Sequence, residues 1–226
     1  MSGAFSLVFE TSTPHASLVL VAPDGSVEQR EFCSDRNHNA MLFEPLHALL
    51  HGARQQKIGL VLVGSGPGSY SGTRVGIAAA QGVAIALGCP AVSVPSILAV
   101  PSAEIGAPCL AIGDARRGSY WSAKMEHSRL VSEPELCDAK GLESLVSKAV
   151  SEGITVFSFE EPGRFPLPEE LVERVVLEFP SAAGLWNAWT LADGETRSAW
   201  SSEIPQPIYL KPPHITPAKR PPLLRS

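Results

Sequence analysis

The residues that fit ligand binding best lie in a glycine- and serine-rich loop at positions 64–72, which reads GSGPGSYSG. An apolar run at 60–63 precedes this loop, and an alanine-rich segment at 73–87 follows it. The first run predicts a strand and the second predicts a helix. A strand, a flexible loop and a helix N-terminus together form a common site for an anion, or for close approach of another backbone.

Two interpretations of this loop stay open. The first is a cradle for a phosphate or nucleotide, although the loop has no Gly-Lys-Ser/Thr sequence and therefore no lysine to reach a phosphate. The second is a tight connection between strand and helix that packs against a partner. Arg74 lies in the expected first helical turn, where the helix dipole disfavours a cation. This placement suggests that Arg74 contacts an anion or a carboxylate, including one on a partner.

A pair of histidines, His47 and His51, raises the question of a metal site. They are four residues apart on a predicted helix, so they share one face and could hold a metal ion together. No glutamate follows the first histidine, so the zinc-protease signature is absent, and we favour surface or interface histidines. The four cysteines have no CxxC spacing, and we interpret them as reduced thiols rather than metal ligands or disulfides.

Two further groups of residues have alternative interpretations. The charged corner at 114–117, which reads DARR, could contact a nucleotide or a partner, or it could be a turn stabilised by Asp114 with solvated arginines. Trp186 and Trp189 are three residues apart on a predicted helix, and we expect them to pack in a core or between lobes.

The composition is that of a folded globular protein. The chain has 226 residues, of which 44% are hydrophobic and 18% charged, enough for a sizeable core. Its net charge of −5 argues against nucleic-acid binding by the chain alone. We see no signal peptide and no membrane-spanning run, so we expect a cytoplasmic protein with no membrane partner.

The order of predicted elements indicates an α/β protein with two lobes. The first lobe, 1–106, has β-β-β-α-β-α order, and the second lobe, 107–204, looks like a smaller, degenerate copy. A proline-rich tail at 205–226 carries Lys211, Lys219, Arg220 and Arg225. We expect strands at 4–10, 16–22, 26–32, 58–63, 91–94, 109–113, 118–125 and 154–159. We expect helices at 39–53, 73–87, 95–104 and 181–192.

The helix expected at 73–87 is apolar on all sides, so it must be buried on more than one side. One face carries Val75, Ala79, Gly82, Val83 and Ala86, and the remaining apolar residues lie around the other side. Its own lobe supplies one cover. The second cover is either a partner subunit or the rest of the same domain, and periodicity alone does not choose between them.

Four stretches of the chain together resemble the TsaB (YeaZ) family, whose members are partners in making threonylcarbamoyladenosine on tRNA. The main one is GPGSYSGTRVG at 66–76, and the others are FSLVFETST at 5–13, GDARRGSYW at 113–121 and PIYL at 207–210. The combination of the glycine loop with the Asp-Ala-Arg hairpin is specific, and the matches span nearly the whole chain. The resemblance implies the actin-like ATPase fold, also called the ASKHA or ribonuclease H-like fold, which the order of elements in the first lobe also indicates.

The resemblance also implies a role for the chain. It would be a non-catalytic scaffold that binds a TsaD-like subunit, which modifies adenosine 37 of tRNA, with a TsaE-like ATPase completing the assembly. The tRNA would be contacted only through the complex, and a homodimer is the alternative when the partner is absent. The implied interface lies on the two helices of the first lobe and comprises Met41, Leu42, Phe43, Leu46, Leu50, Ile77, Ala80, Ala84 and Leu87.

The resemblance gives this chain no catalytic residue, metal or cofactor of its own, with ATP or ADP expected only at an interface with partners. Actin-like enzymes use an acidic residue at the first turn for a metal-bound nucleotide; this chain has Glu10 where the family usually has aspartate. Residues that could contact a nucleotide or anion are Glu10, Thr11, Gly66, Gly68, Ser69 and Arg74. The rival functions are an independent actin-like ATPase or small-molecule kinase, and a peptidase.

Overall fold

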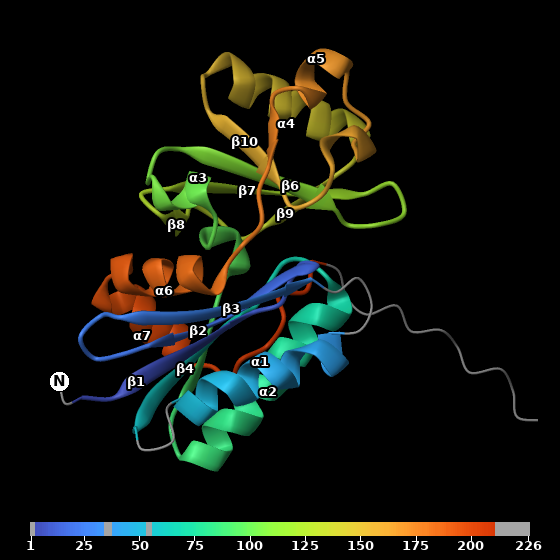
Figure 1. The fold of residues 1–226 in the computed structure, drawn as a ribbon. Coiled ribbons are helices and arrows are strands. Elements are labelled where there is room, and N and C mark those ends of the chain that lie inside the picture. Colours follow the sequence, from blue (N-terminus) through green and yellow to red (C-terminus); the bar gives the residue numbers. More distant parts are fainter. Residues whose placement is uncertain (1–2, 34–37, 53–55, 211–226) are drawn as a thin grey trace, which may run out of the picture.

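The structure is a computed structural model that describes residues 3–33, 38–52 and 56–210, without the side chains of 38–40. Its elements form two β-sheets, each with helices packed against it (Figure 1). The basic part of the expected tail, 211–226, lies outside the described residues.

The first sheet has five strands in the order β3-β2-β1-β4-β5. Strands β1, β2 and β3 form an antiparallel meander, whereas β4 pairs in parallel with both β1 and β5. The strands are β1 (Phe5–Glu10), β2 (His15–Val21), β3 (Val27–Cys33), β4 (Ile58–Gly64) and β5 (Ala91–Val94). Because β1 and β4 are parallel, the turn after β1 and the glycine loop after β4 lie at the same edge of the sheet.

Two helices, α1 (His38–Gly52) and α2 (Tyr70–Leu87), cover one face of this sheet (Figure 1). Helix α2 begins at Tyr70, three residues before the expected start, because the Ser69 side chain caps it by accepting from the Gly72 N–H at 3.3 Å. It ends at Gly88, whose left-handed backbone is the usual C-cap.

The connection from the first sheet to the second differs from the single helix expected at 95–104. It consists of a 3-10 turn, η1 (Ser96–Leu98), followed by the short helix α3 (Pro101–Glu104). Val100 has an extended backbone, as expected for a residue before proline, and Pro101 opens the new helix. The proline therefore divides the predicted helix in two.

The second sheet has the order β11-β10-β6-β7-β8, with β9 also paired to β7. Helix α4 (Ala139–Ser151) packs on it through Leu142, Val146 and Ala149. The strands are β6 (Cys109–Asp114), β7 (Tyr120–Glu126), β8 (Arg129–Leu130), β9 (Glu135–Cys137), β10 (Thr155–Ser158) and β11 (Val175–Leu177). The short elements η2 (Pro162–Arg164) and α5 (Glu169–Val172) lie between β10 and β11.

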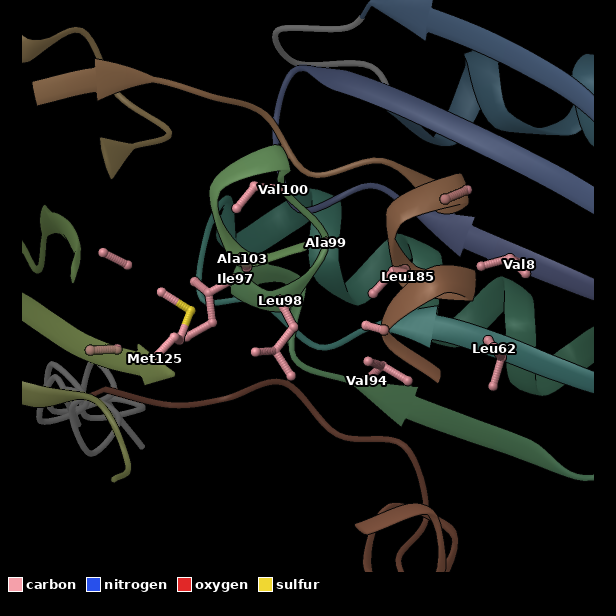
Figure 2. Packing of buried hydrophobic residues seen from close by; sticks show 14 of the residues in the cluster. Val8, Leu62, Val94, Ile97, Leu98, Ala99, Val100, Ala103, Met125 and Leu185 are labelled. Atoms are coloured by element: carbon pink, nitrogen blue, oxygen red, sulfur yellow. The ribbon is translucent and has the colours of Figure 1, made fainter. Parts of the chain in front are cut away.

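The last two helices, α6 (Ala182–Leu191) and α7 (Gly194–Ser201), return to the first sheet. Helix α6 contacts β1, β2 and β4 on the face opposite α1 and α2. Gly184 permits this approach, since a Cβ there would lie 2.4 Å from the Ala99 carbonyl oxygen. Figure 2 shows Leu185 of α6 beside the labelled side chains of β1, β4, β5 and η1.

The buried cluster under α6 continues from the first sheet to the second. It joins Val8 and Leu62 to η1 and then to Met125 of β7 (Figure 2). The boundaries 1–106 and 107–204 stay a prediction, but the contacts place α6 and α7, which that prediction assigned to the second lobe, on the first sheet. Within the described ranges, no helix is both long and apolar enough to cross a membrane.

Candidate functional site

The glycine loop is held in place by hydrogen bonds to neighbouring segments. The Gly66 N–H donates to Ser96 Oγ at 3.0 Å, and the Ser69 N–H donates to the Ser12 carbonyl oxygen at 2.6 Å. The Ser65 N–H donates to the Val94 carbonyl oxygen at 2.9 Å. These bonds fix the loop between the turn after β1 and the start of η1.

Glu10, at the end of β1, lies beneath this loop with no exposed surface. Its Oε1 accepts from the Ser12 N–H at 2.6 Å, whereas neither its Oε2 nor Ser12 Oγ has a hydrogen-bond partner among the described residues. Burial raises the pKa of the Glu10 carboxyl, although the hydrogen bond from the Ser12 N–H opposes this effect. Burial therefore favours the protonated form of this carboxyl more than water would.

Two glycines leave room for the side chains of the first turn. A Cβ on Gly64 would lie 2.0 Å from Glu10 Oε2 and 2.5 Å from Ser96 Oγ. A Cβ on Gly76 would lie 2.2 Å from Thr11 Oγ1, which donates to the Gly72 carbonyl oxygen at 2.8 Å. The first turn and α2 are thus in direct contact, with no free space between Glu10 and β4.

These contacts fit poorly with a nucleotide phosphate. The predicted residues Glu10, Thr11, Gly66 and Ser69 do come together, but each is hydrogen-bonded to Ser12, Gly72 or Ser96, and Glu10 is fully buried. Gly68 is exposed, and its backbone passes against Ser12. Nucleotide or anion contact at this loop stays a prediction.

Arg74 contacts two tyrosines instead of a carboxylate. Its guanidinium lies 3.8 Å from the centre of the Tyr70 ring, and its Nη2 donates to the Tyr209 hydroxyl at 2.7 Å. Tyr209 belongs to residues 205–210, a segment that we call the strap. The strap is tied to the site by Gln81, whose Nε2 donates to the Pro205 carbonyl oxygen, and by the Ile208 N–H, which donates to the Ser65 carbonyl oxygen at 2.9 Å.

The second feature of the site is an apolar groove of about 550 Å³ between α1 and α2. Phe43 and Leu46 of α1 form one side, and the other side is the small-residue face of α2 with Arg74 at one end. The α2 residues that line it are Arg74, Val75, Ala78, Ala79, Gly82, Val83 and Ala86. Such a face permits close approach of another helix. We call this feature the α1–α2 groove.

The predicted interface residues divide into two groups. Met41, Phe43 and Leu87 are exposed, with 44%, 60% and 47% of their surface accessible, and Leu50 is half-buried. Most of the others lie under the helices in the core against the first sheet, so that part of the predicted set cannot form a free surface. The buried residues are Leu42, Leu46, Ile77, Ala80 and Ala84, of which only Leu46 also reaches the groove.

The histidine pair lies on the exposed side of α1. The His47 and His51 rings are 6.1 Å apart between centres, and both side chains are exposed. No group of three or more His, Cys, Asp or Glu side chains within the described ranges could hold a metal ion. The role of the two histidines stays open.

The charged corner at 114–117 forms a turn stabilised by Asp114. Asp114 Oδ1 accepts from the Arg116 N–H at 2.6 Å, and Arg116 and Arg117 have left-handed backbones with φ of 67° and 59°. Both arginine side chains are exposed. Trp186 and Trp189 are partly buried against the cluster under α6, which confirms that they serve packing.

Burial also changes the acidity of the thiols. It raises the pKa of Cys109 to about 11, and the negative charge of Glu178 adds to the effect. Burial likewise raises the pKa of Cys89 and Cys137. Cys33 is exposed and has its Sγ 3.5 Å from His15 Nδ1.

Comparison with known proteins identifies the family. A family model described as "TsaD: tRNA N6-adenosine threonylcarbamoyltransferase" matches residues 33–172. A protein of Bacillus subtilis named tRNA threonylcarbamoyladenosine biosynthesis protein TsaB is 26% identical over 136 residues, 58% of this chain. The protein of the same name in Escherichia coli is 31% identical over 123 residues, 51% of this chain. The matched regions span 59% and 53% of the lengths of these two relatives.

Solved structures show the class of fold. A Pseudomonas aeruginosa protein described as similar to peptidase YEAZ superposes with a TM-score of 0.69 at 21% identity, over 92% of this chain and all of that one. A second structure, named YeaZ from the same organism, gives 0.65 with the same identity and coverage. Together with the strand order, this likeness defines a two-sheet α/β protein of the actin-like class, which confirms the predicted fold.

The chain belongs to the family that the matching model describes, and its curated relatives and YeaZ neighbours place it among the TsaB (YeaZ) proteins. The resemblance drawn from the glycine loop and the Asp-Ala-Arg hairpin is thereby confirmed.

Sequence reasoning missed several residues that the structure brings to these sites. Ser96 contacts the loop from η1, while Tyr70 and Tyr209 flank Arg74. Nothing local marks Ser96 or Tyr209 as neighbours of the loop, because each is distant from it in sequence. The residues that line the groove on α2 could have been found by assigning its other face to the partner.

Proposed function

We propose that this chain is a non-catalytic subunit of an assembly that forms threonylcarbamoyladenosine on tRNA, and that it docks through the α1–α2 groove on a TsaD-like subunit. The names of the curated relatives and of the matching family supply the reaction. A TsaE-like ATPase completes the assembly, and any ATP or ADP binds at an interface with these partners rather than in this chain.

The observation that carries this proposal is the groove itself. Its floor is apolar and made of small side chains, and large hydrophobic residues stay exposed on the same two helices. Phe43 is 60% exposed and Ile85 is 82% exposed, whereas the opposite sides of α1 and α2 are fully packed on the sheet. Exposed apolar patches next to a concave surface are typical of protein interfaces.

The rival functions have less support from the geometry. An independent ATPase or kinase would use the glycine loop and Glu10. The Gly66 and Ser69 N–H groups of the loop already donate to Ser96 and Ser12, and the Glu10 carboxyl is fully buried. The word peptidase appears in the description of one structural neighbour, but that likeness shows the fold alone at 21% identity. A homodimer through the same groove remains the alternative state when the partner is absent.

The test is the mass of the complex, measured by size-exclusion chromatography with light scattering. The purified chain is mixed with the TsaD homologue of its own organism and compared with Ala78→Arg and Ala86→Arg. Both alanines are exposed and line the groove, so arginine can be accommodated without disturbing the core. Ala199→Arg is the matched control, because it makes the same change at an exposed alanine of α7 on the other face of the sheet.

We expect a one-to-one complex that forms with the wild-type chain and with the Ala199→Arg control. The two groove variants should weaken it at least tenfold, since each places a charged side chain in an apolar contact. A wild-type chain that stays alone or self-paired at micromolar concentration would contradict the proposal. Groove variants that bind as tightly as the control would place the interface elsewhere.

A further inference from the structure

The α1–α2 groove carries its charge at one end. Of the nine described residues that line it, eight are apolar or glycine, and only Arg74 is charged. Arg74 lies near the N-terminus of α2, and the other α2 residues of the lining continue along the helix to Ala86. The groove therefore combines a long apolar wall with a cation where the wall begins.

The α2 side of the groove has the spacing and length of a helix contact. Its residues recur three or four positions apart from Val75 to Ala86, so they form one stripe along the helix. From Arg74 to Ala86 this stripe spans about 18 Å, which equals about three turns of a helix laid beside it. A Cβ on Gly82, in the middle of the stripe, would meet no neighbouring atom within 4 Å, so a side chain of another helix has room there.

The charge of Arg74 is not balanced by an acid within the part of the chain that the structure describes. Its guanidinium lies 3.8 Å and 5.5 Å from the ring centres of Tyr70 and Tyr209, and one N–H donates to the Tyr209 hydroxyl at 2.7 Å. None of the ion pairs between described residues includes Arg74. Because the side chain is exposed and a guanidinium has five N–H donors, most of its hydrogen-bonding capacity faces water.

A partner that covers the groove displaces this water. Burial of an unpaired charge costs free energy, whereas a carboxylate opposite a guanidinium balances the charge and accepts two N–H bonds at once. A free anion would use Arg74 without the apolar wall. A wholly apolar helix would use the wall and leave the arginine covered and unpaired. A helix that carries both an apolar stripe and a carboxylate fits the whole groove.

We propose that the element of the TsaD-like partner that occupies the α1–α2 groove is a helix with an apolar stripe and an Asp or Glu side chain that pairs with Arg74. The carboxylate accepts from N–H groups that face water in the free chain, and the stripe packs on the small residues between Val75 and Ala86. Arg74 then determines specificity, since it favours a partner with an acidic residue at this end and disfavours one with a basic residue. The inference rests on the proposed function, because it names the chemistry of the partner at the same groove.

The first test is a covalent link between the two proteins. The Arg74→Lys variant is mixed with the TsaD homologue and a water-soluble carbodiimide, which activates carboxylates. The amine that the variant introduces attacks the activated carbon of a carboxylate in contact with it, an amide bond forms, and the reagent leaves as a urea with one carboxylate oxygen. We expect mass spectrometry of the digested complex to find position 74 linked to an Asp or Glu of the partner. Arg164→Lys, the same change at an exposed arginine of η2, is the matched control and should give no link.

The second test is the affinity of the complex, measured by isothermal titration calorimetry. Arg74→Gln should weaken the complex about tenfold or more, because it leaves the carboxylate of the partner covered and unpaired. Arg74→Lys should weaken it less, since the charge is kept. Arg164→Gln should bind as the wild type does. Arg74→Glu should bind more weakly than Arg74→Gln, and arginine at the linked position of the partner should restore its binding.

The outcomes separate this inference from the docking proposal. The inference is wrong if a complex forms but position 74 gives no link to the partner, or if Arg74→Gln binds as tightly as the wild type. In both cases Ala86→Arg should still weaken the complex, and the docking proposal would stand without this inference. A link from position 74 to a second copy of this chain in place of the partner would also overturn the inference. The absence of any complex would overturn the docking proposal and this inference with it.

Discussion

The buried carboxyl of Glu10 makes the stability of this chain depend on pH in a way that Glu10→Gln should remove. Glutamine has nearly the shape of protonated glutamic acid, so it can keep the hydrogen bond from the Ser12 N–H and occupy the space beside Gly64. It cannot ionise. The variant therefore fixes this position in the neutral form that burial favours.

Whether the free energy of unfolding rises or falls with pH follows from the direction of the Glu10 pKa shift. Burial raises the pKa of Glu10 above its ordinary value of 4.5, so the folded chain binds this proton more tightly than the unfolded chain does. The free energy of unfolding then falls as the pH rises from 4.5 to the pKa of Glu10 in the folded state. Above that pKa, the contribution of Glu10 to the free energy of unfolding no longer changes with pH. One proton corresponds to a slope of about 1.4 kcal/mol per pH unit across this window.

The assay is urea unfolding followed by circular dichroism, for both proteins, at half-unit steps from pH 4.5 to 8.5. We expect the wild type to lose stability relative to Glu10→Gln with the stated slope, and the difference to level off at high pH. Glu143→Gln, which removes an exposed carboxyl of α4, is the control for the loss of one acidic group. A constant difference over the whole range, or a wild type that gains stability relative to Glu10→Gln, would refute the reasoning.

Two further predictions concern packing and thiol chemistry. Gly64→Ala should lower the free energy of unfolding by about 3 kcal/mol, because its Cβ would lie 2.0 Å from Glu10 Oε2. Gly82→Ala, whose Cβ would meet no atom within 4 Å, should raise the free energy of unfolding by about 0.5–1 kcal/mol. Equal urea midpoints for the two variants would contradict this packing prediction. Cys109, with a pKa of about 11, should react with iodoacetamide at pH 8 at least tenfold more slowly than the exposed Cys33. Mass spectrometry of the labelled peptides measures both rates, and equal labelling would show that β6 is accessible.

The strands and helices of the first sheet could be predicted because their local signals agree. Alternation along β1 places Leu7 and Phe9 on one face of the sheet and Val8 on the other, as the two separate clusters show. The glycine loop marks the end of β4, and Gly88 marks the end of α2. These are effects of neighbouring residues, which a sequence displays directly.

The face of α2 that meets the sheet could not be predicted from periodicity. Since the helix is apolar on all sides, its hydrophobic pattern has no clear direction, and Ala80 and Ala84 look as suitable for a partner as Ala78 and Ala86. Only the position of β1 and β4 decides that the first pair is buried and the second exposed.

Other elements were missed although they have local signals. The prediction contains no helix at 139–151, yet α4 has a local start signal. Asp138 caps its N-terminus, with a carboxylate that accepts from the Gly141 N–H at 2.8 Å, and the buried positions of α4 follow helical spacing. Helix α7 is capped in the same way by Asp193. The return of α6 to the first sheet has no local signal, because it depends on the contact of Gly184 with Ala99.

Formation of the modified nucleoside in a purified system tests the central claim most directly. The TsaD homologue, a TsaE-like ATPase, tRNA and an enzymatic source of the threonylcarbamoyl donor are combined with and without this chain, and threonylcarbamoyladenosine is measured by mass spectrometry of the digested tRNA. We predict that the product forms only when the chain is present, and that Ala86→Arg abolishes it while Ala199→Arg does not. Full product in the absence of this chain would contradict the account.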